Sequence, residues 1–422
     1  MSRKITLTAV AVTAALMSVN VNAAGFQVNE HSASGLGRAF SGEAAVADNA
    51  SVLARNPAAM TLFKTAEFSG AISIVDPDID VKDNDFNKEN NDIGQTAKDV
   101  APLAIVPATY YIHPLNDRFA VGLAIFSSYG VATEYPADFN AGSSAGETSL
   151  ITLNFNPNIA YRINEHFSIG AGVSLVYGDA ELTRFLGSQA QAVNGGSPSD
   201  KTIKMEGDTT GWGWNIGALY EINDDHRFGL SYRSQVDLDF DGDFTDYLGG
   251  ITGTPNNTVP GSLSVVLPAI AEFSGYHALN SQWAVHYGIQ WIQYSKFEEL
   301  RGTGDQCTPG YDNQAGVCLL KDEDYDDNSR YSIGATYILN PTWTLRAGFA
   351  FDEQAGKSTL SIPDTDRYWY SAGATYTYSP KMTFDVGLTY LDGKEATFTE
   401  DDTSFTSTGG AIISAAQINY KF

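Results

Sequence analysis

The sequence predicts an all-β fold: a transmembrane, antiparallel β-barrel of about 14 strands whose lumen is plugged by an N-terminal hatch. Three observations predict it. Apolar and polar residues alternate with a period of two in segment after segment, as expected of strands with one apolar face and one polar face. Short polar turns alternate with long connections between these segments. Aromatic residues and glycine are abundant, with 22 Tyr, 22 Phe and 40 Gly in 422 residues.

The first residues have the features of a secretory signal. Two basic residues precede the apolar run 5–17, and small residues follow it up to Ala23. The run is shorter than the roughly 20 residues of a membrane-spanning helix. We therefore expect residues 1–23 to be a signal peptide and the mature chain to begin at Ala24.

Residues 65–422 contain the alternating segments of the barrel. In one of them, Met382 and Phe384 alternate with Thr383 and Asp385. Several segments exceed the roughly 9–11 residues that cross a bilayer, so the barrel should project beyond the membrane on one side. The even count and the alternating connection lengths favour a bacterial outer-membrane barrel over a soluble sandwich or propeller. The segments are 65–75, 102–113, 117–134, 147–162, 166–187, 202–222, 225–242, 262–278, 282–300, 329–339, 342–352, 366–378, 381–392 and 410–422.

The chain is strongly acidic. Its 25 Lys and Arg against 50 Asp and Glu give a net charge of −25, which argues against nucleic acid as a partner. We expect solvated loops where the long connections gather acid, with a calcium site or a contact to cations bound by lipopolysaccharide as the alternative. These acidic residues include Asp76, Asp78, Asp80, Asp83, Asp85, Glu89 and Asp92 in the first connection and Asp322, Glu323, Asp324, Asp326 and Asp327 in the fifth.

The only cysteines are Cys307 and Cys318, in a segment rich in Gly, Asp and Asn. An exported chain folds in an oxidising compartment, so a disulfide that pins one loop is the favoured interpretation. A metal or catalytic role is the alternative. The sequence calls for no metal and no cofactor.

Residues 24–64 do not alternate. They are rich in Gly, Ala, Ser and Asn and include the turn-forming pair Asn56 and Pro57, so they are too polar to build a core alone. A barrel well beyond eight strands cannot fill its lumen with its own side chains. We expect residues 24–64 to form a hatch inside the barrel, with a disordered periplasmic arm as the alternative.

Several motifs resemble the FadL family, the outer-membrane transporters of long-chain fatty acids and related hydrophobic compounds. The hatch carries the most specific of them. The resemblance implies a 14-stranded barrel in which ligand is captured among extracellular loops, binds an internal pocket and leaves through a gap in the wall. The motifs are AGFQVNE (24–30), SGLGRA (34–39), SGE (41–43), RNPA (55–58), SYG (128–130), ATE (132–134), GWGWN (211–215), YRS (232–234), SIPD (361–364) and DR (366–367).

The resemblance also implies a ligand site. Arg184 and Lys321 stand at the positions that meet the ligand head group, and Phe26 lies in the same pocket. A carboxylate buried in an apolar cavity needs a cationic partner, and charge-assisted hydrogen bonds are stronger than neutral ones. The alternative is that Arg184 and Lys321 are ordinary charges at strand ends.

The resemblance further implies a lateral gate. Gly130 matches the glycine at the kink of the third strand, where a glycine favours a bulge and leaves space in the wall. Asn56, Pro57 and Ala58 would form the hatch turn that approaches this gap. The alternative for Gly130 is a glycine tolerated near the loop rim. One connection departs from the family: 187–200 is short and polar, and the segment 244–261 would have to supply apolar capture surface.

Other functions are weighed against this one. A barrel phospholipase would need a Ser nucleophile with a His base, and no Ser-centred motif accompanies His286, so we expect no enzyme. A general porin, or a channel for aromatic hydrocarbons, are further alternatives. We expect contacts with outer-membrane lipid and lipopolysaccharide, recognition of the terminal Phe422 by barrel-assembly machinery, and a monomer.

Overall fold

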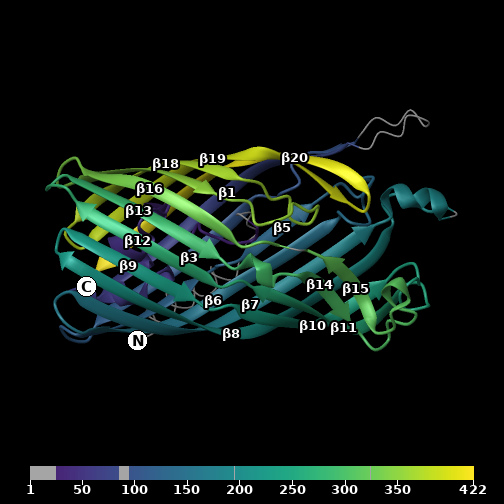
Figure 1. The fold of residues 1–422 in the computed structure, drawn as a ribbon, viewed down its shortest axis with the longest axis horizontal. Helices are drawn as coiled ribbons and strands as arrows, with labels where there is room; N and C mark the ends of the chain where they lie inside the picture. Colours follow the sequence, from purple (N-terminus) through teal and green to yellow (C-terminus); the bar gives the residue numbers. More distant parts are fainter. Residues whose placement is uncertain (1–24, 85–94, 194, 324) are drawn as a thin grey trace, which may run out of the picture.

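The computed structural model describes residues 25–84, 95–193, 195–323 and 325–422. These residues form one antiparallel barrel, with the C terminus at one end and the β10–β11 and β14–β15 hairpins at the other (Figure 1). The predicted signal peptide lies outside the described residues. No helix in the described ranges is long and apolar enough to cross a membrane.

The wall has 14 spans, the number predicted from the sequence. Of the 20 described strands, β2 only extends the pairing of β1. Five spans each consist of two consecutive strands: β4 with β5, β9 with β10, β11 with β12, β13 with β14 and β15 with β16. The strands are β1 (Glu67–Asp83), β2 (Thr96–Ala97), β3 (Ala104–Pro114), β4 (Phe119–Phe126), β5 (Gly130–Glu134), β6 (Glu147–Arg162), β7 (Phe167–Phe185), β8 (Lys201–Asn223), β9 (His226–Arg233), β10 (Val236–Asp246), β11 (Asn257–Leu267), β12 (Ile270–Ala278), β13 (Trp283–Ile292), β14 (Glu299–Thr303), β15 (Val317–Asp322), β16 (Asn328–Ile338), β17 (Trp343–Asp352), β18 (Arg367–Ser379), β19 (Met382–Glu400) and β20 (Thr403–Lys421).

The barrel closes between its first and last spans, as predicted. β1 pairs with β20 over its whole length and with β3 on its other edge. The amide of Phe422 donates to the carbonyl oxygen of Ala66 at 2.9 Å, so the last residue takes part in the closure.

The prediction of a loop that starts after residue 75 was wrong. β1 continues to Asp83 because β20 offers it a partner as far as Phe405. The described acidic residues of the supposed first loop, Asp76, Asp78, Asp80 and Asp83, therefore lie in a strand. Asp85, Glu89 and Asp92 lie outside the described residues, as does Asp324.

The same asparagine hydrogen bonds stabilise five of the short turns. In the turn after β3, the Asn116 side-chain oxygen accepts from the amides of Arg118 and Phe119 at 2.9 and 3.0 Å. Asparagine favours turns because its side chain satisfies backbone donors two and three residues on. The same two bonds recur in four further turns, at Asn164, Asn223, Asn280 and Asn340.

The two faces of the wall differ as the alternation predicts. Outward side chains such as Val173, Leu230 and Val386 are 50%, 57% and 55% exposed, and form an apolar surface suited to lipid. Inward positions in the half of the barrel near the C terminus carry many alanines, and the larger Tyr110 and Ile112 of β3 pack in the same cluster as buried apolar residues from the range 50–60. The other half is lined by the buried apolar cluster around Phe26 and Phe240.

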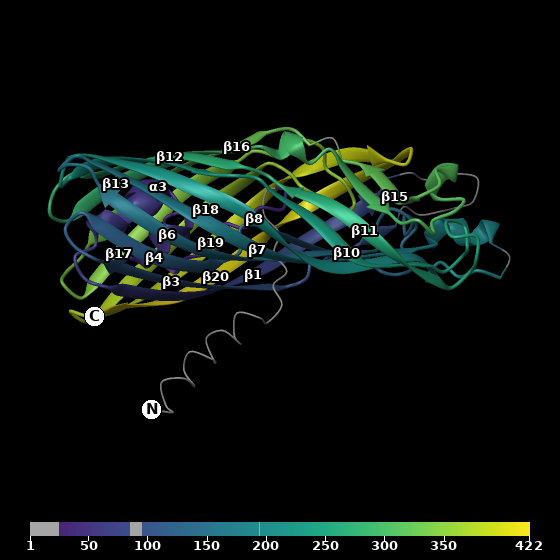
Figure 2. The same cartoon turned by 90° about the horizontal axis from the view of Figure 1, so that it is seen from below.

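Residues 25–63 lie inside the barrel and are almost entirely buried (Figure 2). We call them the N-terminal segment. It contains α2 (Ala33–Leu36), α3 (Glu43–Val46) and the 3-10 turns η1 (Ala50–Ala54) and η2 (Pro57–Leu62). α2 packs on β18, β19 and β20, whereas α3 packs on β9 and β12, so the segment touches opposite walls.

Wall glycines let the N-terminal segment approach the strands closely. A Cβ added at Gly348 would lie 2.1 Å from the backbone of Arg38, and one at Gly229 would lie 2.0 Å from the carbonyl oxygen of Ala44. Neither backbone contact can be relieved by turning a side chain. The alternation of glycine with apolar residues therefore serves packing on the inner face as well as the strand pattern.

Candidate functional site

An apolar cavity lies in the half of the barrel away from the C terminus. The space between its lining atoms, part of which is open to solvent, is about 690 Å³. The spans on its wall run from β5 and β6 through β7, β8 and β10 to β11 and β14. Its apolar lining comprises Phe26, Val131, Leu150, Leu182, Met205, Phe240, Leu263, Val265, Phe297, Leu300 and Ile362.

The structure brings Arg184 and Lys321 together. The Arg184 Nη2 donates to the hydroxyl of Ser361 at 2.9 Å, and the Lys321 Nζ donates to the same oxygen at 3.0 Å. Ser361 lines the cavity. The two predicted head-group residues therefore lie at its edge, although one comes from β7 and the other from β15.

The two cations are balanced differently. Arg184 is buried, and within the described chain its hydrogen bonds go only to uncharged oxygens, of Glu147, Thr148, Thr183 and Ser361. Lys321 forms ion pairs at 3.0 and 3.4 Å with Glu400 and Glu323. Glu400 and Glu323 interact with the charge of Arg184, but no carboxylate in the described chain hydrogen-bonds to it. A buried guanidinium without a directly bound carboxylate attracts an incoming anion, so Arg184 is the stronger attractor.

Glu323 departs from the expectation of a solvated acidic loop. Its side chain is fully buried, at 0% exposure, beside Lys321. Burial raises the pKa of Glu323, and Lys321 opposes that shift. The prediction was wrong here because β15 and the connection after it fold inward against the cavity rim.

Phe26 lies in the cavity wall. Its ring packs against Tyr129, Tyr294 and Phe297 at centroid distances of 5.5, 5.2 and 5.0 Å. The amides of Phe26 and Gln27 both donate to the Tyr294 hydroxyl, at 3.0 and 2.8 Å. The N-terminal end of the segment is therefore fixed by one phenol from the turn after β13.

The third span is broken where the sequence predicted a kink. β4 ends at Phe126 and β5 begins at Gly130. β4 pairs with β3 only up to Ile125, so the wall loses its hydrogen bonds to β3 beyond that point. A Cβ at Gly130 would lie 3.2 Å from the carbonyl oxygen of Leu150, a tight approach that glycine relieves.

The N-terminal segment fills this break. The Gly130 amide donates to the carbonyl oxygen of Phe26, and the Val28 amide donates to that of Ser128, both at 2.8 Å. Gln27 and Tyr129 form an antiparallel bridge between these bonds. Three residues of the segment thus replace the strand partner that the break removes.

The turn at Asn56, Pro57 and Ala58 packs elsewhere on the wall. The Asn56 side-chain amide donates to the carbonyl oxygens of Ala44 and Ala218 at 2.7 and 3.0 Å, and its oxygen accepts from the Ala58 amide. A Cβ at Gly170 would lie 2.5 Å from the backbone of Pro57 and Ala58. The turn therefore seats on β7 and β8, while residues 26–28 make the contacts at the break.

An ion-pair network holds the middle of the N-terminal segment. Arg38 pairs with Glu43 at 2.6 Å and with Asp48 at 3.1 Å, and Asp48 pairs with Arg346 of β17 at 2.9 Å. Burial opposes the charge on Glu43, yet Arg38 and His31 lower its pKa to about 2. The segment is therefore tied to the wall by charge as well as by packing.

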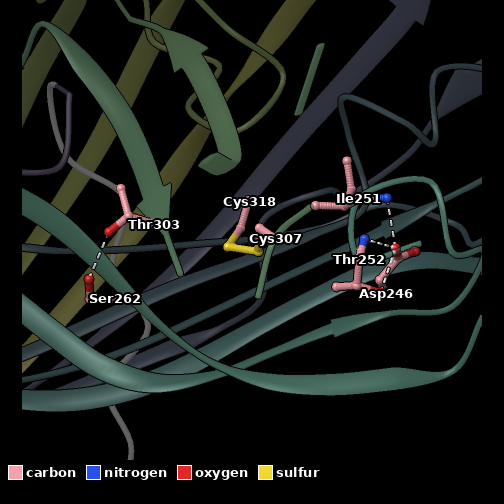
Figure 3. The surroundings of a disulfide bond; sticks show 7 residues. All are labelled: Asp246, Ile251, Thr252, Ser262, Thr303, Cys307 and Cys318. Carbon is pink, nitrogen blue, oxygen red and sulfur yellow. Dashed lines mark hydrogen bonds between the residues drawn. A yellow bond between two sulfur atoms is a disulfide. The ribbon is translucent and has the colours of Figure 1, made fainter. Parts of the chain in front are cut away.

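The predicted disulfide is present. Cys307 and Cys318 are bonded with a Cα separation of 5.3 Å, and both are buried in the apolar cluster that includes Phe26. Figure 3 shows the bridge next to Ser262 and Thr303, with Asp246 and Ile251 beyond it. The bridge closes the connection between β14 and β15 over the cavity end.

Asp246 organises the neighbouring loop. Its carboxylate accepts from four backbone amides, those of Leu248, Gly249, Ile251 and Thr252, at 2.7–3.1 Å (Figure 3 draws two of these residues). Charge-assisted bonds of this kind are stronger than neutral ones. The loop therefore has a fixed shape, with Ile251 packed against the apolar cluster.

A serine and a histidine meet in the barrel, which sequence reasoning missed. The Ser41 hydroxyl lies 2.7 Å from His286 Nδ1, and His286 Nε2 lies 3.1 Å from the Thr336 hydroxyl. Ser41 also donates to the carbonyl oxygen of Arg38 at 2.7 Å. No carboxylate orients the imidazole in the described residues, and the pair is fully buried, so it serves packing of the segment on β13.

Ser361 and Tyr294 also escaped the sequence analysis. Ser361 lies in the motif 361–364, which indicated the family but not the hydrogen bonds of Ser361 with Arg184 and Lys321. Tyr294 stands in a 3-10 turn that interrupts the ninth span, inside a segment read as one strand. Neither position shows a pattern that separates it from the other serines and tyrosines.

Comparisons with known proteins agree with the fold and the motifs. A family model for outer membrane protein transport proteins (OMPP1/FadL/TodX) matches residues 14–422. A long-chain fatty acid transport protein of Escherichia coli O6:H1 is 39% identical over 450 residues, covering 99% of this chain and 98% of that protein. A 47 kDa outer membrane protein of Pasteurella multocida is 40% identical over 438 residues, covering 99% of each.

The fold has a solved counterpart. The crystal structure of a Pseudomonas aeruginosa FadL homologue is 22% identical and superposes with a TM-score of 0.82, covering 94% of this chain and 100% of that chain. The family resemblance inferred from the motifs is confirmed, and so is the location in the outer membrane, which the chain crosses many times. The chain belongs to the OMPP1/FadL/TodX family of outer membrane transport proteins.

Proposed function

We propose that the protein takes up long-chain fatty acids across the outer membrane without energy input. Full-length relatives named long-chain fatty acid transport proteins support this proposal. A chain transferred from water into an apolar cavity gains about 0.8 kcal/mol per buried methylene, so binding itself can draw the ligand in.

The observation that carries the proposal is the pairing of an apolar cavity with Arg184. This guanidinium is buried and hydrogen-bonds only to uncharged oxygens in the described chain. Arginine is suited to bind both oxygens of a carboxylate at once. A fatty acid would place its carboxylate between Arg184 and Lys321 and its chain along the apolar lining toward Phe26.

The exit would run through the break in the third span. Residues 26–28 occupy that break, and Phe26 also lines the cavity. A ligand that displaces the Phe26 ring would also loosen the backbone bonds at Gly130. The N-terminal segment would then act as a hatch, and the ligand would leave sideways between β3 and β5.

Two alternative functions can be distinguished from fatty acid uptake by experiment. A carrier of neutral aromatic hydrocarbons would use the same apolar cavity but would not need the two cations. A general porin would need an open lumen, which the buried N-terminal segment occupies. We assign no catalytic role to the site.

The test is oleate uptake by cells that lack their own transporter and express this chain. Wild type should restore uptake, and the Arg184→Ala/Lys321→Ala double variant should lose most of it while toluene uptake is kept. Arg301→Ala, which removes a half-exposed cation of β14 paired with Glu299, is the matched control and should behave as wild type. Equal loss for both ligands, or no loss for oleate, would refute the head-group role.

A second arm addresses the hatch. Deletion of residues 24–64 should convert the barrel into an open pore, with steady conductance in planar bilayers and loss of selectivity for fatty acids. Large steady channels in the wild-type protein would instead favour the porin.

A further inference from the structure

Met205 extends along the inner face of the barrel wall at the loop end of the cavity. It stands on β8, lines the cavity and is 5% exposed. A Cβ added at Gly302 of β14 would lie 2.7 Å from the Met205 Cε and 2.9 Å from its Sδ. β8 and β14 belong to the sixth and ninth spans, and β10 and β11 lie between them in the sheet, so Met205 reaches past two strands on the inner face of the wall.

Gly302 provides the recess that receives the thioether. It pairs with Leu319 of β15, and its ideal Cβ would also lie 3.2 Å from the Leu319 Cβ. Gly302 itself is not part of the cavity lining. Any side chain here would push Met205 away, so the glycine defines where the methionine can rest.

Apolar surface continues on the loop side of this contact. Ile203 lies two residues closer to the loop end of β8 than Met205, and it packs with Ile251 against the same apolar cluster. Leu248, in the loop that Asp246 organises, is 42% exposed. Apolar residues therefore extend from the loop that Asp246 organises to the cavity lining, and Met205 lies among them.

We propose that Met205, seated in the recess of Gly302, is the gate between the apolar loop surface and the cavity. The proposal rests on the proposed function, because it supposes that the cavity receives a fatty acid. Methionine suits this role, since its unbranched chain has three rotatable bonds and can swing aside without moving the strand. The gate lies on the entry side and is separate from the break at Gly130.

A gate acts on rates rather than on affinity. It is closed in the free protein and closes again over the bound ligand, so it adds the same barrier to entry and to escape. A side chain that only lines the cavity acts differently, because its contacts stabilise the bound state and slow dissociation alone. The two roles can therefore be separated by kinetics.

The test is stopped-flow binding of a naturally fluorescent polyene fatty acid to the purified full-length protein in detergent. Met205→Ala should raise the association and dissociation rate constants together, each by roughly tenfold, which corresponds to a modest lowering of one barrier. The Kd should change by less than about threefold. Met205→Leu, which conserves volume but cannot reach Gly302, should change the rates in the same direction if the alanine variant folds poorly.

The swapped variant Met205→Ala/Gly302→Met supplies a rescue. It places the thioether in the same space from β14 instead of β8, so both rate constants should return toward wild type. Leu150→Ala is the matched control, because Leu150 lines the cavity from β6, away from Gly302 of β14. It should raise only the dissociation rate constant and weaken the Kd.

The outcomes separate the two proposals. Absence of binding by the wild-type protein would overturn the proposed function. Binding by wild type, with Met205→Ala altering only dissociation as Leu150→Ala does, would overturn the gate and leave the function standing. Failure of the swapped variant to slow both rates would also overturn the gate.

Discussion

Arg184 and Lys321 donate to one oxygen, the hydroxyl of Ser361, at 2.9 and 3.0 Å. Arg184 comes from the fifth span and Lys321 from the tenth, while Ser361 stands in the connection between β17 and β18. One neutral hydroxyl therefore accepts hydrogen bonds from two cations that are 137 residues apart in the sequence (321 minus 184). It occupies the position where a ligand carboxylate would be most favourable.

Replacing this hydroxyl by a carboxylate should block the head-group site. In Ser361→Asp the new side chain would pair with both cations, so oleate should bind at least about tenfold more weakly, as expected for the loss of a charge-assisted bond. Oleyl alcohol, which lacks the charge, should lose far less affinity. Ser361→Ala is the control and should weaken oleate binding only about threefold. Equal losses for acid and alcohol in Ser361→Asp would contradict the assignment.

Removing one phenolic oxygen should release the N-terminal end of the segment. Tyr294→Phe leaves the amides of Phe26 and Gln27 without their acceptor, at a cost of about 1–3 kcal/mol for each buried donor. Hydrogen–deuterium exchange at these two amides should become faster by tenfold or more. Tyr135→Phe is the control, because the buried Tyr135 hydroxyl has no hydrogen-bond partner in the described chain. Unchanged exchange in Tyr294→Phe would show that other contacts fix this end.

A side chain at a wall glycine should unseat the N-terminal segment. In Gly348→Val the new Cβ would meet the Arg38 backbone at 2.1 Å, and neither backbone can turn away. The segment should leave its seat while the barrel still forms, giving an ionic leak in planar bilayers. Gly70→Val places the same side chain on β1, where the nearest atoms are 3.4 Å away on the Phe68 ring. That variant should stay closed. A leak in Gly70→Val would show that the close contact at Gly348 is not what holds the segment in place.

Acid should loosen the segment through His31. Burial, aided by Arg55, lowers the pKa of His31 from 6.5 to about 4. The neutral imidazole therefore contributes fully to the stability of the seated segment above pH 6.5, and this contribution is lost as the pH falls through 4. The largest stability change from this titration is about 3 kcal/mol. Glu30 acts in the opposite sense. Burial raises its pKa from 4.5 to about 7, so its contribution is complete below pH 4.5 and lost as the pH rises through 7.

Two variants separate these contributions in bilayer conductance at pH 7 and pH 4.5. His31→Gln should show less opening on acidification than wild type, because the titrating imidazole is gone. Glu30→Gln should show more, because the group that compensates for His31 is gone. Identical pH profiles in wild type and both variants would mean that neither His31 nor Glu30 controls how firmly the segment is held in the barrel.

The sequence by itself determined the barrel, its 14 spans and its closure. Period-two alternation is a local property, because successive side chains point to opposite faces of any strand. The turns were also local, since Asn116 satisfies the amides that follow it in the chain. The two cysteines could be read in the same way, whereas the role expected of Gly130 came from the family resemblance.

Only the tertiary structure decided how distant inward side chains meet. No sequence pattern indicates that Met205 of β8 reaches Gly302 of β14, because the contact depends on the curvature of the barrel wall. The breaks in the seventh, eighth and ninth spans were missed because their residues alternate well enough to pass as strand. The site itself depends on long-range closure: Arg184, Lys321 and Ser361 share one oxygen only because the closed sheet returns three separate segments to one rim.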